Sequence, residues 1–406
     1  MVDQKDVQRR ELIFLAVAVV LAMSAWFSTA AVLPDLRLAW GLSTAQASWL
    51  TIVVQIGFIF GAVFSSIGKL ADRVNPRRLI LFGALGAAAA NILVVVGDSF
   101  TVGIIARTIT GAFLALVYAP ALKAMSAWYR KGRGLALGVI VGAISLGSAL
   151  PHLVNAVGGL RWEATLVIVS LLSAAGGLVA DRLCTDGPYM DPPTDFDLSQ
   201  FGEIIKNRDF RLASAGYFGH MWELYAMWAW IAAFYGDVFE SPQAASLAAF
   251  AAIGAGAFGA VYAGLMSDHR SRSDAAALAM RWSASVAVVV GFLIDAPTPV
   301  VVAIGLIWGF WVVADSAQFS VIVTEVIEAR FVGTALTLQL AAGFILTILT
   351  IFLVPVIRDA ASWGWAFLLL APGPILGAWA MRMLRLGPRS SAQVEPEPEQ
   401  WISPFF

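Results

Sequence analysis

The chain has 406 residues, of which 59% are hydrophobic and only 13% are charged, and its mean hydropathy is +0.80. A soluble domain carries roughly 25% charged residues, so this composition excludes a soluble protein and indicates a chain surrounded mostly by lipid. The formal net charge of −1 gives no reason to expect nucleic acid as a partner. A single cysteine, Cys184, excludes an intramolecular disulfide framework.

Long apolar runs predict twelve membrane-spanning helices along the chain. Runs of about 20 apolar residues cross a bilayer as helices, because the backbone must satisfy its own hydrogen bonds in hydrocarbon. In the first half of the chain the runs cover residues 12–33, 48–67, 79–97, 101–122, 135–156 and 164–181. In the second half they cover residues 212–235, 243–263, 276–294, 300–322, 333–356 and 364–381. The expected fold is all-α, with two pseudo-symmetric six-helix bundles.

The basic residues predict how these spans are oriented. Lys and Arg together number 26, and nearly all lie at the chain ends or in the connectors that follow even-numbered spans. Only Arg37, Arg161 and Arg358 lie in connectors on the other side, and Arg107 lies within a span. The positive-inside rule therefore places both termini in the cytoplasm, with the chain in the inner membrane of the cell.

Composition divides the chain into four regions. Two six-helix halves, 1–181 and 212–386, are joined by the cytoplasmic linker 182–211, whose apolar content is too low for a core of its own. The cytoplasmic tail 387–406 carries Ser, Pro and Glu, and we expect it to be mobile. We expect a monomer embedded in the lipid bilayer.

A repeated connector follows the second and the eighth predicted spans. Residues 68–78 read GKLADRVNPRR and residues 264–272 read GLMSDHRSR, so Gly68 and Asp72 recur as Gly264 and Asp268, about half a chain apart. Duplication of this kind is typical of transporters built from two repeats. Glycine permits close helix approach, and aspartate can accept hydrogen bonds from a neighbouring helix N-terminus. A simple topological anchor would use the same basic residues.

These connectors resemble the major facilitator superfamily of secondary transporters, in particular its bacterial-type twelve-span members. The family signature G-x-L-A-D-R-x-G-R-R/K is matched at six positions, Gly68, Leu70, Ala71, Asp72, Arg73 and Arg77. Asn75 stands where the family has glycine, a tolerable change because Asn visits the left-handed region more readily than most residues. The resemblance implies a cytoplasmic latch that favours one conformation, formed by Gly68, Asp72, Arg73 and Arg77, with Asp268 as its weaker copy.

Four ionisable residues stand out within the predicted spans, where a charge costs at least about 2.5 kcal/mol and needs a reason. They are Arg107, His220, Glu223 and Asp315. Arg107 also matches a family pattern, R-x-x-x-G. The resemblance implies that helices one, four, seven and ten line a central cavity, and these residues lie on helices four, seven and ten. All four are candidates for proton coupling or substrate contact. Structural pairing of the acids with Arg107 or with neighbouring backbone is the alternative.

Helical spacing adds further candidates for the lining of such a cavity. They are Tyr118, Tyr217, Trp308, Trp311, Gln318 and His152. For the span-five stripe that contains His152 and Asn155, bonding between helices is the favoured interpretation. For Trp311 the cavity is favoured, because an indole there would stack on an organic substrate, and for Trp222 packing is favoured.

The sequence predicts a secondary active transporter that moves a small organic solute by alternating access, coupled to protons. It contains no G-x-x-x-x-G-K-[ST] phosphate loop, so a gradient is the expected energy source. With three histidines in the chain, no metal site is expected around His220 and Glu223, and we expect no other cofactor. No catalytic motif such as G-x-S-x-G indicates an enzyme. An uncoupled facilitator or exchanger of the same fold, or a non-transporting membrane sensor, remains open.

Overall fold

The computed structural model describes residues 4–158, 160–189 and 197–386, and these residues form helices and connectors without a strand. Ten of the described helices are long and apolar enough to cross a membrane. The predicted all-helical membrane fold is confirmed. The tail 387–406, expected to be mobile, and the linker residues 190–196 lie outside the described residues.

The first half of the chain contains ten helical elements. They are α1 (Gln4–Ala22), the 3-10 helix η1 (Met23–Ala25), α2 (Ser28–Ala31), α3 (Leu33–Trp40), α4 (Thr44–Ile67), α5 (Leu70–Arg73), α6 (Pro76–Gly97), α7 (Phe100–Ser126), α8 (Arg133–Gly158) and α9 (Trp162–Leu183). Side chains cap the starts of the long ones, because the first N–H groups of a helix have no partner within it. Ser43 and Gln46 form a capping box at α4, and Ser99 caps α7.

The second half of the described chain follows the same plan. Its elements are the 3-10 helix η2 (Leu198–Gln200), α10 (Phe201–Lys206), α11 (Arg208–Val238), α12 (Pro242–His269), α13 (Arg272–Val289), the 3-10 helix η3 (Val290–Leu293), α14 (Thr298–Ala314), α15 (Ser316–Val326), the 3-10 helix η4 (Ala329–Phe331), α16 (Val332–Ala360), α17 (Trp363–Leu368) and α18 (Pro372–Leu386). Asn207 caps α11 and Ser241 caps α12. Because these capping residues lie before the predicted spans 212–235 and 243–263, α11 and α12 begin earlier than predicted.

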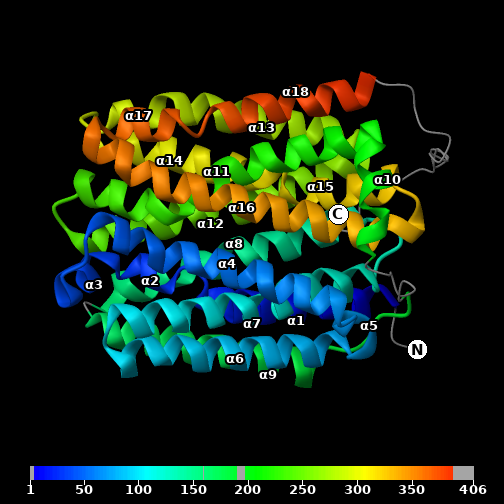
Figure 1. Cartoon of the computed structure of the whole chain (residues 1–406), viewed down its shortest axis with the longest axis horizontal. Coiled ribbons are helices and arrows are strands. Elements are labelled where there is room, and N and C mark those ends of the chain that lie inside the picture. The colour runs from blue at the N-terminus through cyan, green and yellow to red at the C-terminus, as the bar shows by residue number, and fades with distance from the viewer. Residues whose placement is uncertain (1–3, 159, 190–196, 387–406) are drawn as a thin grey trace.

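The two halves of the chain lie side by side, with the blue-to-cyan elements along one side of the molecule and the green-to-red elements along the other (Figure 1). Two helix pairs join them, α4 with α16 and α8 with α12. A large buried core contains residues of both halves, among them Phe58 and Phe344. The interface between halves is therefore packed as an interior, and this is where a shared site can form.

Four predicted spans are interrupted in the structure. Two of them are 276–294, where α13 gives way to η3, and 364–381, which is divided between α17 and α18. The run 12–33 was expected to be one helix, but α1 gives way to η1, α2 and α3 between residues 23 and 33. The run 300–322 is divided at Asp315, where α14 ends and α15 begins. Two further long helices, α1 and α11, are not among the ten that pass the length and composition test. The count of twelve spans therefore stays a prediction.

The connector after α4 differs from expectation in its backbone. Asn75 does not take the left-handed conformation; it has φ −53° and caps α6 by accepting a hydrogen bond from the backbone N–H of Arg77. Lys69 takes the left-handed conformation instead, with φ 50°. Asn therefore replaces glycine at this position because a capping side chain is needed there, not because of a positive φ.

The described parts of the linker are attached to both halves. At one end, Nε of Arg77 lies 3.0 Å from Oδ1 of Asp186. At the other end, the backbone N–H of Asp197 donates to Oγ1 of Thr334 over 2.9 Å. Ile204 of α10 is buried in a core cluster with Phe210. The linker thus adds to the core of the second half although it has none of its own.

Candidate functional site

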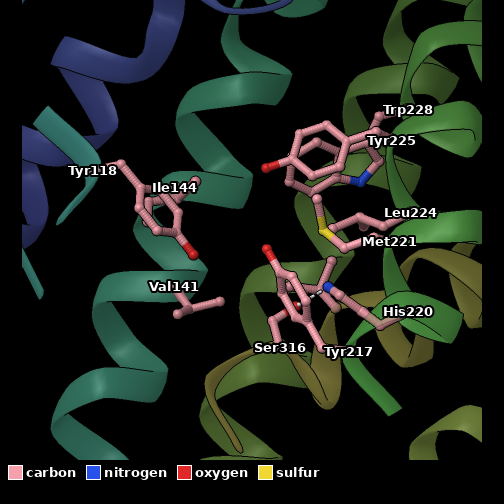
Figure 2. A pocket seen from close by; sticks show the side chains of 11 residues that line it. Tyr118, Val141, Ile144, Tyr217, His220, Met221, Leu224, Tyr225, Trp228 and Ser316 are labelled. Atoms are coloured by element: carbon pink, nitrogen blue, oxygen red, sulfur yellow. Dashed lines mark hydrogen bonds between the residues drawn. The ribbon is translucent and has the colours of Figure 1, made fainter. Parts of the chain in front are cut away.

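A small pocket lies between the two halves and is lined mainly by α11 (Figure 2). Its lining residues are Tyr118, Val141 and Ile144 from the first half and Tyr217, His220, Met221, Leu224, Tyr225, Trp228, Val313 and Ser316 from the second. The pocket has a volume of about 20 Å³, room for about one water molecule. None of the lining residues is Lys or Arg, so the wall offers neutral donors rather than a cation.

Three tyrosines give this pocket its polar character. Figure 2 shows the hydroxyl groups of Tyr118, Tyr217 and Tyr225 pointing into the same space from opposite sides. None of these hydroxyls has a hydrogen-bond partner among the described residues. Buried phenol hydroxyls usually bond to protein or water. The convergence therefore marks a place where water or a solute oxygen would be bound.

An aromatic cluster continues from the pocket across the interface between halves. The ring centroids of Phe58 and Phe344 lie 4.5 Å apart, and those of Trp26 and Tyr225 lie 5.5 Å apart. Tyr118 meets the edge of Phe58 at 5.7 Å. Contacts at these distances are typical of attractive ring pairs. Of these five residues only Tyr118 and Tyr225 line the pocket, and Trp26, Phe58 and Phe344 are buried in the core next to them.

His220 connects the pocket with a buried carboxylate. Its Nδ1 lies 2.7 Å from Oδ1 of Asp315, and its Nε2 lies 3.0 Å from Oγ of Ser316, which also lines the pocket. His220 and Asp315 are 4% and 3% exposed. Asp315 is positioned by the break between α14 and α15, which turns the chain at this point. A proton entering the pocket could pass to Asp315 through this imidazole.

Glu223 lies one turn further along α11 and is 2% exposed. Its Oε1 accepts a hydrogen bond from Nε1 of Trp308 over 2.6 Å, and its Oε2 accepts one from Oγ of Ser283 over 2.8 Å. No described cation forms an ion pair with it. A charged carboxylate without a counter-ion is costly to bury. Binding a proton would relieve that cost, which suits a reversible proton carrier.

Arg107 is buried away from these carboxylates. Its Nη1 donates to the carbonyl oxygen of Ala25 over 2.8 Å and to Oδ1 of Asn91 over 2.8 Å, and its Nη2 donates to the carbonyl oxygen of Trp26. These carbonyls are released where α1 breaks into η1. The alternative in which Arg107 pairs with an intramembrane acid does not occur among the described residues. Its contacts hold the broken segment in place.

The structure brings some of the remaining candidates to the site and separates others. Trp308 bonds to Glu223, whereas Trp311 stacks on Trp282 at a centroid distance of 6.0 Å and lies away from the pocket lining. Gln318 and His152 are buried, and their side-chain polar atoms have no hydrogen-bond partner among the described residues. Trp222 bonds to the carbonyl oxygen of Leu369 between helices, as packing requires.

Asp268 closes one end of the interface between halves. Its two carboxylate oxygens each accept a backbone hydrogen bond of 3.0 Å, from Gly134 and from Leu135 at the start of α8. A carboxylate at a helix N-terminus is stabilised by the free N–H groups and the helix dipole. At the same end, Oγ of Ser66 lies 3.0 Å from Oγ1 of Thr337, joining α4 to α16.

The other residues of the predicted latch lie on the first half. Gly68 ends α4 with φ −71°, and Arg73 is exposed. Arg77 binds Asp186 and the carbonyl oxygen of Cys184 over 2.7 Å, so its described contacts stay within that half and the linker. The side chain of Asp72 lies outside the described residues.

Polar contacts also close the opposite end of the interface. Oγ1 of Thr44 donates to Oδ2 of Asp359 over 3.1 Å, between the start of α4 and the end of α16. Nδ2 of Asn155 donates to Oγ of Ser246 over 3.0 Å, between α8 and α12. With both ends joined, the pocket is enclosed between the halves, consistent with its small volume.

The prediction from sequence missed several residues of the site. Tyr225 and Trp228 line the pocket and Ser283 binds Glu223. A signal for the first two existed, because Tyr225 and Trp228 each lie eight residues, or about two helical turns, after a predicted residue, Tyr217 and His220 respectively. Ser283 lies on another helix with no motif around it, and only the fold brings it to Glu223.

Comparison with known proteins identifies the family. The family model described as Major Facilitator Superfamily matches residues 15–314. The chain is 26% identical over 254 residues to the MFS-type transporter pynF of Aspergillus niger, covering 59% of this chain and 55% of that protein. It is 28% identical over 268 residues to the MFS-type transporter pytF of Aspergillus terreus, covering 64% of this chain and 88% of that protein.

Among solved structures, the fold is similar to that of the proton:xylose symporter XylE bound to 6-bromo-6-deoxy-D-glucose. The TM-score is 0.68, with 94% of this chain and 96% of that chain covered. At 13% sequence identity this likeness shows the fold alone. Both relatives named above are fungal, so the resemblance to bacterial-type twelve-span members stays a prediction.

Proposed function

Because the chain belongs to the Major Facilitator Superfamily, we propose that it moves a small organic solute across the membrane by alternating access and couples this movement to protons. The observation that carries the proposal is the enclosed pocket between the halves, with His220 in its wall and the buried Asp315 in contact with this histidine. Glu223 supplies a second protonatable group one helical turn away. We further expect both termini in the cytoplasm.

The lining of the pocket supports a neutral, flat solute that carries oxygen atoms. Tyr118, Tyr217 and Tyr225 offer hydroxyl donors, and their rings together with that of Trp228 give the lining its aromatic character. A bare inorganic anion would need a permanent cation, and neither Lys nor Arg lines the pocket. A pocket of about 20 Å³ is too small for such a solute, so binding requires the halves to move apart at one end.

Coupling follows from the position of the carboxylates beside this pocket. When the pocket opens to one compartment, water reaches His220, and the imidazole can exchange a proton with Asp315 over 2.7 Å. Neutralising the carboxylates removes the cost of enclosing them when the halves close. Release on the other side completes the cycle, so the proton gradient drives the solute without ATP.

The test uses purified protein in proteoliposomes that contain a trapped pH-sensitive dye. A panel of phenols, aromatic acids and sugars is first screened for thermal stabilisation, because a ligand of the folded state raises its melting temperature. Uptake of the stabilising solutes is then measured under an imposed pH gradient. Glu223→Gln and Asp315→Asn should each reduce gradient-driven accumulation at least tenfold and retain solute exchange. Glu240→Gln, at an exposed carboxylate after α11, is the matched control.

Each outcome separates the proposal from its alternatives. Unchanged accumulation in both variants would contradict proton coupling and leave a facilitator or an exchanger. No flux of any stabilising solute would support a membrane sensor instead. Normal coupling in Asp315→Asn but not in Glu223→Gln would assign the proton to Glu223 alone.

A further inference from the structure

A groove on the outer surface of the second half differs from the rest of the lipid-facing surface. It lies between α13 and α18, which run next to each other along one edge of the molecule (Figure 1). Its volume is about 910 Å³, at the upper end of the range for small-molecule sites. It lies outside the pocket between the halves and shares no lining residue with it.

The groove is cationic along one part of its length. Arg281, Arg382 and Arg385 line it together with one acid, Asp274. Arg385 forms an ion pair with Asp274. No described carboxylate pairs with Arg281 or Arg382, and Nε of Arg281 bonds only to the carbonyl oxygen of Ala277 on its own helix, over 3.1 Å. Among the described residues, two positive charges of the groove therefore have no counter-ion.

The position of Arg281 makes this charge unusual. It lies nine residues after Arg272, where α13 begins, or about 13 Å along the helix at 1.5 Å per residue. This places Arg281 within the candidate membrane span Arg272–Leu293, and its side chain is exposed on the outer surface. A charged group facing hydrocarbon is costly unless it meets an opposite charge or reaches the headgroup layer.

The other part of the groove is apolar. Val288 of α13 and Ile375 and Trp379 of α18 line it and are 37%, 53% and 58% exposed. On both helices these residues lie on the far side of the arginines from the end of the molecule that carries α5 and α10 (Figure 1). The groove is therefore complementary to an amphiphile: its arginines lie toward that end of the molecule, and its apolar part lies toward the membrane interior.

We propose that this groove binds an anionic phospholipid, with the phosphate on Arg281 and Arg382 and an acyl chain along Val288, Ile375 and Trp379. Basic pockets between transmembrane helices recognise anionic headgroups by this combination of charge and apolar surface. A free phosphate would use the arginines but leave the trough empty, and a zwitterionic lipid would not neutralise the two unpaired cations. The proposal predicts that the stability of the folded protein depends on an anionic lipid, whichever solute the protein transports.

The experiment measures the melting temperature of the full chain in a neutral detergent. Phosphatidylglycerol, phosphatidylcholine and inorganic phosphate are titrated separately, and lipids that remain bound are counted by native mass spectrometry. Phosphatidylglycerol should raise the melting temperature of the wild type by several degrees more than phosphatidylcholine does. Inorganic phosphate should have no effect. Arg281→Gln/Arg382→Gln should weaken the apparent affinity for phosphatidylglycerol at least tenfold.

Two further variants keep the result interpretable. Arg78→Gln/Arg182→Gln removes two exposed arginines outside the groove and should leave the lipid effect unchanged. Arg281→Lys/Arg382→Lys keeps both charges, should fold normally and should retain most of the effect. An equal response of the wild type to the two lipids would overturn the proposal, as would stabilisation by inorganic phosphate alone or an unchanged response in the Gln variant.

Discussion

Cys184 lies directly after α9, where the linker begins, and its surroundings hold the thiol in its protonated form. It is 4% exposed. Burial raises the pKa of the Cys184 thiol from 9.0 to about 12, the nearby Glu11 carboxylate raises it further, and the Arg77 guanidinium opposes the shift. The folded state therefore binds this proton more tightly than the unfolded state does. The resulting stability is present below pH 9.0 and is lost as the pH rises toward about 12.

We predict that Cys184 reacts very slowly with maleimide in the folded protein. Since the pKa rises from 9.0 to about 12, the thiolate fraction at pH 7.5 falls roughly a thousandfold, and the thiolate is the reactive species. Labelling followed by mass spectrometry should be negligible over minutes and complete after denaturation in detergent. An exposed thiol, Ser199→Cys in a Cys184→Ala background, should label rapidly. Similar rates for the two would contradict this prediction.

At the scale of single elements, the broken first helix shows what the sequence could not predict. Apolar runs predicted the position of nearly every helix, because burial in lipid depends on local composition. The break after Ala22 has no strong local signal, since the run 12–33 contains no charged residue, proline or glycine and its few polar residues are Ser24, Ser28 and Thr29. Arg107 of α7 donates to the free carbonyls of the break, and Asn91 of α6 accepts hydrogen bonds from Arg107 and from Ser28 of α2; the fold brings both from distant positions.

In the candidate site, too, the local sequence predicted the ionisable residues but not the residues that they contact. His220, Glu223 and Asp315 were predictable because ionisable groups are rare in spans. Their partners could not be predicted. The contacts of His220 with Asp315 and of Glu223 with Ser283 form only because helices far apart in the chain pack together. Trp311 followed the correct helical spacing, but it lies against Trp282, because spacing gives a face of a helix and not its neighbour.

We predict that the contact between α12 and α14 depends on glycine. A Cβ added at Gly259 would fall on the carbonyl oxygen of Phe310, because the two backbones touch there. Gly259→Ala should destabilise the protein by about 1–3 kcal/mol, the usual cost of overpacking, seen as a lower melting temperature in detergent. Gly254→Ala on the same helix is the control, since its nearest atom is Cδ1 of Leu146 at 3.6 Å. Equal melting temperatures would show that the helices can separate freely.

At the scale of the whole molecule, the halves are held together at both ends by a small number of polar bonds. Asp268 with α8 and Ser66 with Thr337 join one end, and Thr44 with Asp359 joins the other. Alternating access requires each set to break in turn while the other holds. In the proposed alternating-access cycle, the relative strength of the two sets therefore decides which side of the pocket opens more often.

We predict that Asp268→Asn shifts this balance toward opening at the Asp268 end. The substitution removes a carboxylate that accepts two N–H groups at the start of α8, each over 3.0 Å. Helix-terminal contacts of this kind contribute about 1 kcal/mol, which corresponds to roughly a fivefold change in population. Ser316→Cys in a Cys184→Ala background reports opening, because residue 316 lines the pocket. Its labelling by maleimide should become about five times faster.

The control for the latch is Asp181→Asn, which removes a carboxylate at the end of α9 whose ion-pair partner, Arg182, belongs to the same half. Opening of the pocket does not require that pair to break, so the labelling rate should not change. If Asp268→Asn behaved like Asp181→Asn, the contact with α8 would be a cap without influence on opening. Labelling in sealed proteoliposomes with an impermeant maleimide gives the side, because only the end that opens admits the reagent to residue 316.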